Sequence, residues 1–298
     1  MELVRRGLAR SRAHAAELVR AGRVLVHGHV ITKPSAPTVP DDAVDVLADP
    51  DDPAYASRAA LKLSGALDAL DQAGVLARSG ERALLAVDGA WCLDLGASTG
   101  GFTDVLLRRG AVHVVALDVG HDQLVPRLRA DVRVTVIEGY NVRDLARSDL
   151  ARSPDLVVGD LSFISLTLVV PALAGILDPG APAVLLVKPQ FEVGRERLGS
   201  GGVVRDPALH VAAVLDVVAA GAHVGLKTRA IVPSPLPGPS GNREYFVVLE
   251  RGDAADGTAA RISAGPSVHA AVEWVPDSRG TERPPVFSTP SSRTGGAL

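Results

Sequence analysis

Four charged residues that lie far apart in the chain have the types needed to activate an alcohol: Lys62, Asp160, Lys188 and Glu244. Asp160 and Lys188 each end an apolar run typical of a buried strand, and Glu244 directly precedes another. In an open α/β sheet, such strand edges face one crevice. A lysine that burial makes partly neutral can take a proton from a ribose hydroxyl, and an ammonium can stabilise the developing alkoxide. The same charges also fit two ordinary buried salt bridges.

A glycine-rich turn after the apolar run 91–95 marks the expected binding site beside these charges. Gly96, Gly100 and Gly101 make a turn without side chains, and a helix pattern begins at Phe102. A strand, a turn and a helix N-terminus together place backbone N–H groups around a ligand. The residues of this run expected to hold the ligand are Asp94, Gly96, Ala97, Ser98, Thr99, Gly100, Gly101 and Phe102.

The acidic residues around this turn favour S-adenosylmethionine over a dinucleotide. A dinucleotide site has the spacing G-x-G-x-x-G, whereas the spacing here is Gly96-x-x-x-Gly100-Gly101. Asp94 would repel a diphosphate but suits the cationic amino-acid end of S-adenosylmethionine. Asp118, about twenty residues beyond the turn, is placed to accept both ribose hydroxyls. Asn141 and Asp160 are expected to border the same site, and a turn without any ligand is the alternative.

Strand and helix patterns alternate through the middle of the chain. The expected strands cover residues 91–95, 112–117, 132–137, 156–160, 183–187, 227–232 and 245–249, and helices are expected over 55–70, 102–109, 166–177 and 207–220. The glycine-rich stretch 194–204 is predicted to be a mobile lid. This order predicts an α/β protein with a doubly wound, Rossmann-like methyltransferase sheet that ends in an antiparallel hairpin.

The first 33 residues have a different character, since they are strongly basic. A helix capped by Ser11 and ended by Gly22 is followed by a hairpin over 24–31, and residues 34–56 hold six aspartates and no basic residue. A small basic α/β module before an acidic connector indicates a polyanionic partner, although a charge run can simply be solvated. The cations expected to contact the phosphates of such a partner are Arg10, Arg12, Arg20, Arg23, Lys33 and Arg58.

Composition limits the other classes of function. The chain has one cysteine, Cys92, within a predicted buried strand, so a disulfide framework and a cysteine-built metal site are excluded. No run of eighteen uncharged apolar residues is present, and the first residues lack the apolar stretch of a signal peptide. We therefore expect a soluble, cytoplasmic, monomeric protein with no membrane association and no metal.

The N-terminal module resembles the ribosomal protein S-four type RNA-binding domain through Ser11-Arg12, Gly22-x-Val24-x-Val26-x-Gly28 and Lys33-Pro34. His27 stands where that domain usually has asparagine, and the first helix is short by several residues, as if the chain began late or the module were weakened. The domain resemblance implies an RNA partner.

Residues 1–248 as a whole resemble the haemolysin-A-like (TlyA) family of bacterial ribosomal RNA 2′-O-methyltransferases. The matching motifs are Ser57-Arg58, Leu61-Lys62-Leu63, Asp94 to Thr103, Ala116 to Gly120, Gln123-Leu124, Asn141-Val142-Arg143, Asp160 to Ser165, Val187 to Glu192 and Gly241 to Glu244. This resemblance implies a Lys-Asp-Lys-Glu tetrad of Lys62, Asp160, Lys188 and Glu244, with Lys188 as proton acceptor and cytidine in ribosomal RNA or ribosomal subunits as substrate. Ala59-Ala60 and the segment 121–126 depart from the family pattern.

The predicted domains are an RNA-binding domain over 1–48, a linker over 49–62, a methyltransferase domain over 63–250 and a disordered tail over 251–298. Trp274 and Phe287 in the tail are not expected to dock on the domain. Two other functions remain open: a pore-forming haemolysin, a label that the family carries for historical reasons, and a non-catalytic ribosome-assembly factor that uses the cofactor fold to clamp RNA.

Overall fold

A computed structural model describes residues 2–9, 12–47, 53–74, 85–238, 240–275 and 283–289. The chain divides into two compact units, residues 1–57 and 58–298. Arg10, Ser11 and part of the predicted linker lie outside the described residues. Lys62 belongs to a helix of the second unit rather than to a linker, because that helix begins at Ala59.

The first unit is a small sheet packed against two helices. Its elements are α1 (Glu2–Arg5), α2 (Arg12–Arg20), β1 (Val24–Val26), β2 (His29–Ile31) and β3 (Val44–Val46), with antiparallel strands in the order β2-β1-β3. Leu3, Leu18 and Val24 are buried in its core. Strand β3 lies within the acidic stretch 34–56 that the sequence predicts to be a connector, so the domain continues further than the basic residues do.

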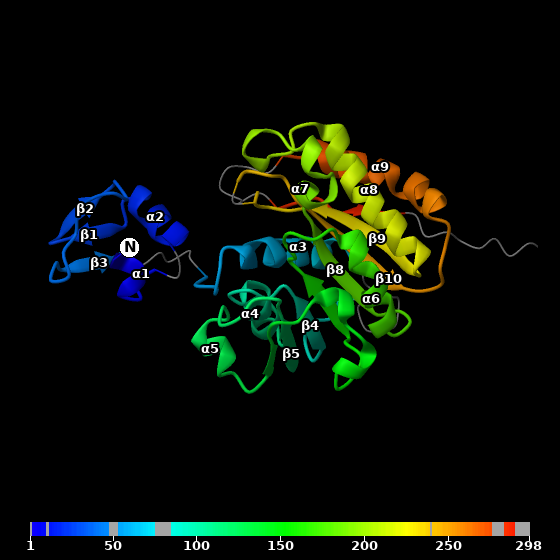
Figure 1. The fold of residues 1–298 in the computed structure, drawn as a ribbon, viewed down its shortest axis with the longest axis horizontal. Coiled ribbons are helices and arrows are strands. Elements are labelled where there is room, and N and C mark those ends of the chain that lie inside the picture. Colours follow the sequence, from blue (N-terminus) through cyan, green and yellow to red (C-terminus); the bar gives the residue numbers. More distant parts are fainter. Residues whose placement is uncertain are drawn as a thin grey trace, which may run out of the picture. The chain divides into compact units, whose positions relative to one another are not determined.

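The second unit is built on an eight-stranded sheet within the described residues (Figure 1). Its strands are β4 (Trp91–Leu95), β5 (His113–Leu117), β6 (Val134–Ile137), β7 (Leu156–Gly159), β8 (Pro182–Val187), β9 (Leu226–Pro233), β10 (Tyr245–Arg251) and β11 (Phe287–Ser288). The strand order is β11-β9-β10-β8-β7-β4-β5-β6. Strands β4 to β8 pair in parallel and β9 to β11 pair antiparallel, which confirms the predicted doubly wound sheet with a terminal hairpin.

Helices cover both faces of this sheet. They are α3 (Ala59–Ala73), α4 (Gly101–Arg108), α5 (Pro126–Arg129), α6 (Val170–Ile176), α7 (Pro189–Glu192), α8 (Pro207–His223) and α9 (Gly257–Glu273). Short 3-10 turns cover Val142–Asp144 (η1), Arg147–Asp149 (η2), Leu166–Leu168 (η3), Arg195–Arg197 (η4) and Ser200–Gly202 (η5). Leu93 and Leu95 pack with residues of α6 and α8, whereas Asp94 contacts α4 on the opposite face.

The sheet creates a crevice where the chain reverses direction across it. From β4 the chain runs outward to β5 and β6, and it then crosses back to β7 on the other side of β4. Ligands of open α/β sheets bind outside the carboxyl ends of strands at such a reversal. The ends of β4 and β7 therefore define where a binding site is expected.

The segment after residue 251 is ordered where the structure describes it, which overturns the prediction of a disordered tail. Helix α9 begins with a side-chain cap from Asp256 and buries Ala264, Val268 and Ala271 against the sheet and α8. Strand β11 pairs with β9, and Phe287 packs on the same core. Small residues and Pro266 within the helix hide its apolar face from a periodicity analysis.

The glycine-rich stretch 194–204 also differs from the predicted mobile lid. Asn242 accepts a hydrogen bond from the Val204 backbone N–H at 2.9 Å and donates one to the Gly202 carbonyl at 3.0 Å. His210 Nε2 contacts the Val204 carbonyl at 2.9 Å. The stretch is thus fixed at its C-terminal end by buried side chains of α8 and of the segment before β10.

Candidate active site

Lys62 and Glu244 form a buried ion pair between α3 and the start of β10. Their Nζ and Oε2 atoms lie 2.6 Å apart, and the two side chains are 8% and 1% exposed. The other carboxylate oxygen of Glu244, Oε1, is buried and has no hydrogen-bond partner within the described residues. A buried oxygen without a donor can accept a hydrogen bond from a further group.

Lys188 and Asp160 form a second ion pair at the ends of β8 and β7. Lys188 Nζ lies 2.8 Å from Asp160 Oδ1 and donates a hydrogen bond to Ser162 Oγ at 2.7 Å. The contact with Asp160 has the distance of an ion pair but not the angle of a hydrogen bond, so Oδ1 remains unsatisfied among the described residues. Both side chains are mostly buried, at 10% and 16% exposed.

Strand register explains why the two ion pairs are neighbours. Tyr245 pairs with Val187 in the antiparallel ladder of β10 and β8, and the next residues outward are Glu244 and Lys188. Asp160 follows the last residue of β7, which is the parallel neighbour of β8 on its other side. Glu244, Lys188 and Asp160 therefore lie at the neighbouring ends of β10, β8 and β7, and Lys62 reaches Glu244 from helix α3.

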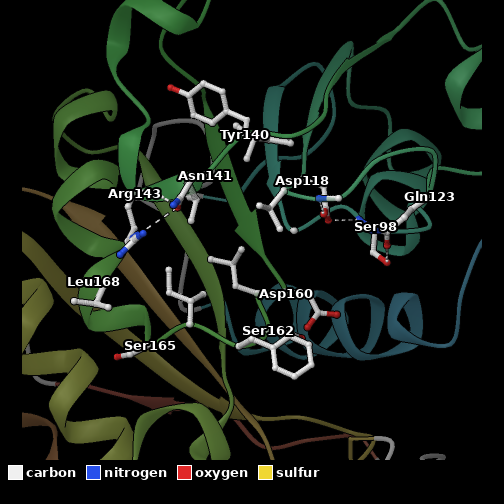
Figure 2. A pocket seen from close by; sticks show the side chains of 18 residues that line it. Ser98, Asp118, Gln123, Tyr140, Asn141, Arg143, Asp160, Ser162, Ser165 and Leu168 are labelled. Atoms are coloured by element: carbon white, nitrogen blue, oxygen red, sulfur yellow. Dashed lines mark hydrogen bonds between the residues drawn. The ribbon is translucent and has the colours of Figure 1, made fainter.

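A cavity of about 760 Å³ opens next to Asp160, at the ends of β4, β5 and β7 (Figure 2). Its volume suits a cofactor of drug-like size. Of the predicted cofactor residues, those that line it are Gly96, Ser98, Asp118, Asn141 and Asp160. In the part of the chain that the structure describes, the remaining ones lie outside its lining: Asp94, Ala97, Thr99, Gly100, Gly101 and Phe102. Asp94 belongs to β4, and the other five build the turn and the helix start that support the wall.

Asp118 and the glycine turn are held together on one wall of this cavity. The carboxylate of Asp118 accepts hydrogen bonds from the Ser98 N–H at 2.8 Å and the Gly120 N–H at 2.7 Å. Gly96 has φ +78°, and a Cβ there would lie 3.0 Å from the Asp160 carbonyl oxygen, so only glycine fits. The turn therefore holds the Asp118 carboxylate directly and lies against the backbone of Asp160, and both residues line the cavity.

Several wall residues had no role assigned from the sequence. Figure 2 shows Gln123 beside Ser98, and Tyr140 and Arg143 on the wall that carries Asn141. Ser162, Phe163 and Ser165 come from the loop that follows Asp160. Their motifs are visible in the sequence, but only the three-dimensional arrangement shows which members face the cavity.

Phe163 stands out because it is an aromatic residue that is 91% exposed. Its φ of +65° is uncommon for a residue with a bulky side chain. Its ring lies 5.1 Å from the ring of Phe191, centroid to centroid. An exposed aromatic face at the rim of a cavity offers a surface on which a planar ring can stack.

Asp94 is fully buried behind the cavity wall and is an unusual acid. Its Oδ2 accepts a hydrogen bond from Thr103 Oγ at 2.7 Å, whereas Oδ1 has no partner in the described chain. Burial raises the pKa of the Asp94 carboxyl to about 7, and the nearby carboxylates of Asp160 and Asp118 add to the increase. A cation placed near Oδ1 would stabilise the charged form.

The Asp94→Asn variant tests this electrostatic environment. Because the carboxyl holds its proton more tightly in the folded chain than in the unfolded chain, the parent loses stability as pH rises from about 4 to about 7. The uncharged amide keeps the acceptor for Thr103 and has no such titration. Urea unfolding at about pH 4.5 and about pH 8 should show that the variant gains stability relative to the parent at the higher pH. An equal difference at both pH values contradicts the assignment.

The cations of the first unit that are predicted to bind RNA differ in their exposure to solvent. Arg12, Arg20 and Lys33 are exposed, and Arg12 and Lys33 line one shallow cavity of about 250 Å³. Arg23 is half-buried and donates a hydrogen bond to the Leu47 carbonyl at 2.6 Å, which ties it into the unit. Arg58 is exposed at the start of α3 in the second unit, and Arg10 lies outside the described residues.

The described ranges lack two features, a helix that could span a membrane and a cluster of metal ligands. None of the helices there has the length and apolar character that crossing a membrane requires. Those ranges also contain no cluster of three or more His, Cys, Asp or Glu residues that could hold a metal ion.

Comparisons with known proteins agree with this architecture. The FtsJ-like methyltransferase model matches residues 55–251, and the S4 domain model matches residues 2–44. The 16S/23S rRNA (cytidine-2′-O)-methyltransferase TlyA of Mycobacterium tuberculosis is 50% identical over 248 residues, which are 83% of this chain and 87% of that protein. The 23S rRNA (cytidine-2′-O)-methyltransferase TlyA of Campylobacter jejuni is 34% identical over 64% of this chain and 69% of its own.

A solved structure described as a hemolysin from Streptococcus thermophilus superposes with a TM-score of 0.68 at 36% identity, covering 90% of this chain and 93% of that one. Its similarity extends over both matched regions, since so much of each chain is covered. The chain therefore belongs to the TlyA family of FtsJ-like methyltransferases, with an S4 domain at its N-terminal end.

Proposed function

We propose that this protein transfers a methyl group from S-adenosylmethionine to the 2′-hydroxyl of a cytidine in ribosomal RNA. The observation that carries the proposal is the Lys188–Asp160 ion pair, because Asp160 lines the same cavity as Asp118. The printed names of the Mycobacterium tuberculosis and Campylobacter jejuni relatives, both rRNA (cytidine-2′-O)-methyltransferases, supply the substrate class.

The cavity has the donor and acceptor set that S-adenosylmethionine requires. Asp118 would accept hydrogen bonds from the ribose hydroxyls, since each carboxylate oxygen has lone pairs beyond those used by Ser98 and Gly120. The glycine turn leaves room for the cofactor to approach the backbone, and the cationic end of the cofactor would favour the charged form of Asp94, which burial otherwise disfavours. When bound, the cofactor supplies an electrophilic methyl carbon on a positively charged sulfur.

Lys188 would act on the acceptor sugar. Its Nζ would take the proton of the 2′-hydroxyl, so that this oxygen can accept the methyl group that the bound cofactor would supply. Asp160 stabilises the ammonium that results, and Lys62 with Glu244 orients the sugar from the next strand. Phe163 offers a stacking surface for the base of the same nucleotide.

An Asp118→Ala variant should lose affinity for S-adenosylmethionine by about tenfold to a hundredfold, because each hydrogen bond to a charged acceptor contributes about 1.5–3 kcal/mol. Isothermal titration calorimetry measures the loss directly. Asp122→Ala is the matched control, since Asp122 is exposed on the same loop and is not part of the cavity lining in the described chain. Equal affinities for Asp118→Ala and the parent contradict this placement of the ribose.

The first unit is expected to supply part of the RNA affinity through phosphate contacts. Replacing both Arg12 and Lys33 with alanine should weaken RNA binding and reduce the slope of log affinity against log salt concentration by about 1 for each cation. Arg5→Ala is a suitable control, because Arg5 is already paired with Glu2. Filter binding over a range of salt concentrations gives the slopes, and an unchanged slope in the double variant excludes these contacts.

The proposed activity can be tested with purified protein and separated ribosomal subunits that lack the modification. Radiolabelled S-adenosylmethionine should transfer its label to RNA in at least one subunit. The relatives differ in this respect, since one name gives 16S and 23S and the other gives 23S alone. Absence of transfer to both subunits, by protein that binds the cofactor, would favour a non-catalytic RNA clamp.

A further inference from the structure

Two segments at the active site are joined side by side by three sets of side-chain contacts. The first is residues 162–166, which form the cavity wall after Asp160, and the second is residues 188–192, which begin with Lys188. Lys188 bonds Ser162, and Phe163 lies against Phe191. The third contact, made by Glu192, has no part in the proposed chemistry.

Glu192 is the last residue of α7, and its carboxylate uses both oxygens on the wall segment. Oε1 accepts a hydrogen bond from the Leu166 N–H at 2.8 Å, where the turn η3 begins, and Oε2 accepts one from the Ser165 hydroxyl. Burial raises the pKa of this carboxyl, while both hydrogen bonds favour its charged form. Through these two hydrogen bonds, the half-buried side chain of Glu192 links α7 to the wall segment 162–166.

The backbone conformation of the wall segment requires contacts of this kind to stabilise it. Phe163 combines a φ of +65° with an exposed ring, so the conformation is costly and packing on the side chain contributes little to it. Ser162 directly precedes Phe163, and it accepts a hydrogen bond from Lys188. Ser165 follows two residues later, and it donates one to Glu192. Residues of 188–192 therefore stabilise the strained backbone at Phe163 through hydrogen bonds made before and after it in the sequence.

We propose that Glu192 is a positioning residue that holds the wall segment 162–166 against the segment of Lys188, so that an acceptor nucleotide seated on the wall meets the Lys188 amine. This inference rests on the proposed function, because that function makes the nucleotide the methyl acceptor. The hydrogen bonds of Glu192 with Ser165 and Leu166 do not depend on it. Glu192 itself is not part of the cavity lining in the described chain, and its carboxylate is bonded to Ser165 and Leu166, so we expect its main effect on the acceptor nucleotide.

The kinetic test compares Glu192→Ala, Glu192→Gln and Glu196→Ala. Glu192→Ala should lower kcat by about tenfold to a hundredfold, because a shift of about 1 Å in a reacting group has an effect of that order. The affinity for S-adenosylmethionine should stay within about twofold of the parent. Glu192→Gln should restore most of the rate, since its amide oxygen can accept from Leu166 and its amide N–H can donate to Ser165. Glu196 is exposed in the next turn and serves as the control.

A second measurement decides the inference without reference to catalysis. Hydrogen exchange followed by mass spectrometry should show faster exchange of a peptide covering 161–168 in Glu192→Ala, and parent-like exchange in Glu192→Gln and Glu196→Ala. Ser165→Ala removes only one of the two bonds and should give a smaller effect, which keeps the test usable if Glu192→Ala does not fold. Parent-like exchange in all variants would contradict the proposal that Glu192 holds the wall segment in place. Equal losses of cofactor affinity and of rate would show that the role of Glu192 is purely structural. If the parent itself transfers no methyl group, the proposed function fails while the exchange result still stands.

Discussion

Lys188→Ala is expected to lower kcat for methyl transfer on the order of 10³-fold, which lies within the range that a positioned acid or base contributes. The variant loses both the proton acceptor and the charge that pairs with Asp160, while the cavity wall with Ser98 and Asp118 is left intact. The affinity for S-adenosylmethionine should therefore remain within a few fold of the parent. Single-turnover transfer to ribosomal RNA gives the rate, and calorimetry gives the affinity.

Lys227→Ala is the matched control for this experiment. The chain has only four lysines, and Lys227 is exposed on β9 in the same unit. Its replacement should leave transfer unchanged. Rates for Lys188→Ala that equal those of Lys227→Ala would remove Lys188 from the reaction and leave the Lys188–Asp160 pair as a structural salt bridge.

Lys62→Met is expected to destabilise the fold by about 3–5 kcal/mol, because it leaves the Glu244 carboxylate buried without its cation. The double variant Lys62→Met/Glu244→Gln should regain much of this loss, since both charges are then absent from the buried site. Neither variant should transfer methyl groups at a measurable fraction of the parent rate. Urea unfolding measures the free energies, provided that the transition is two-state.

The two outcomes of this cycle separate stability from catalysis. Recovery of stability without recovery of activity assigns a chemical role to the pair beyond its contribution to the fold. A loss of less than about 1 kcal/mol in Lys62→Met, the value typical of exposed pairs, would contradict the buried ion pair.

The sequence predicts the sheet well because its central strands are continuous apolar runs. The runs at 91–95 and 183–187 cannot be amphipathic helices of useful length, and each ends at a charged or glycine-rich turn. Parallel order then places Asp160 and Lys188 at one edge without any further information. Register adds Glu244, since the antiparallel partner of β8 begins opposite the end of that strand.

The failures have physical causes that are equally specific. Helix α9 buries alanine and valine rather than a wide stripe of large residues, and it contains Pro266, so its pattern does not resemble a packed helix. The sequence also does not show that the guanidinium of Arg23, which is predicted to bind phosphate, donates to the Leu47 carbonyl of the same unit. The backbone strain at Phe163 and the tie from Glu192 depend on contacts between segments, which no local pattern records.

The chemical identity of the product tests the central claim most directly. Ribosomal RNA treated with the parent protein and S-adenosylmethionine should be digested to nucleosides and analysed by mass spectrometry against standards for sugar-methylated and base-methylated cytidine. The account predicts 2′-O-methylcytidine with the parent and none with Lys188→Ala. Methylation of the cytosine base, or of another nucleoside alone, would contradict it, because an amine paired with Asp160 would then not be acting on a ribose hydroxyl.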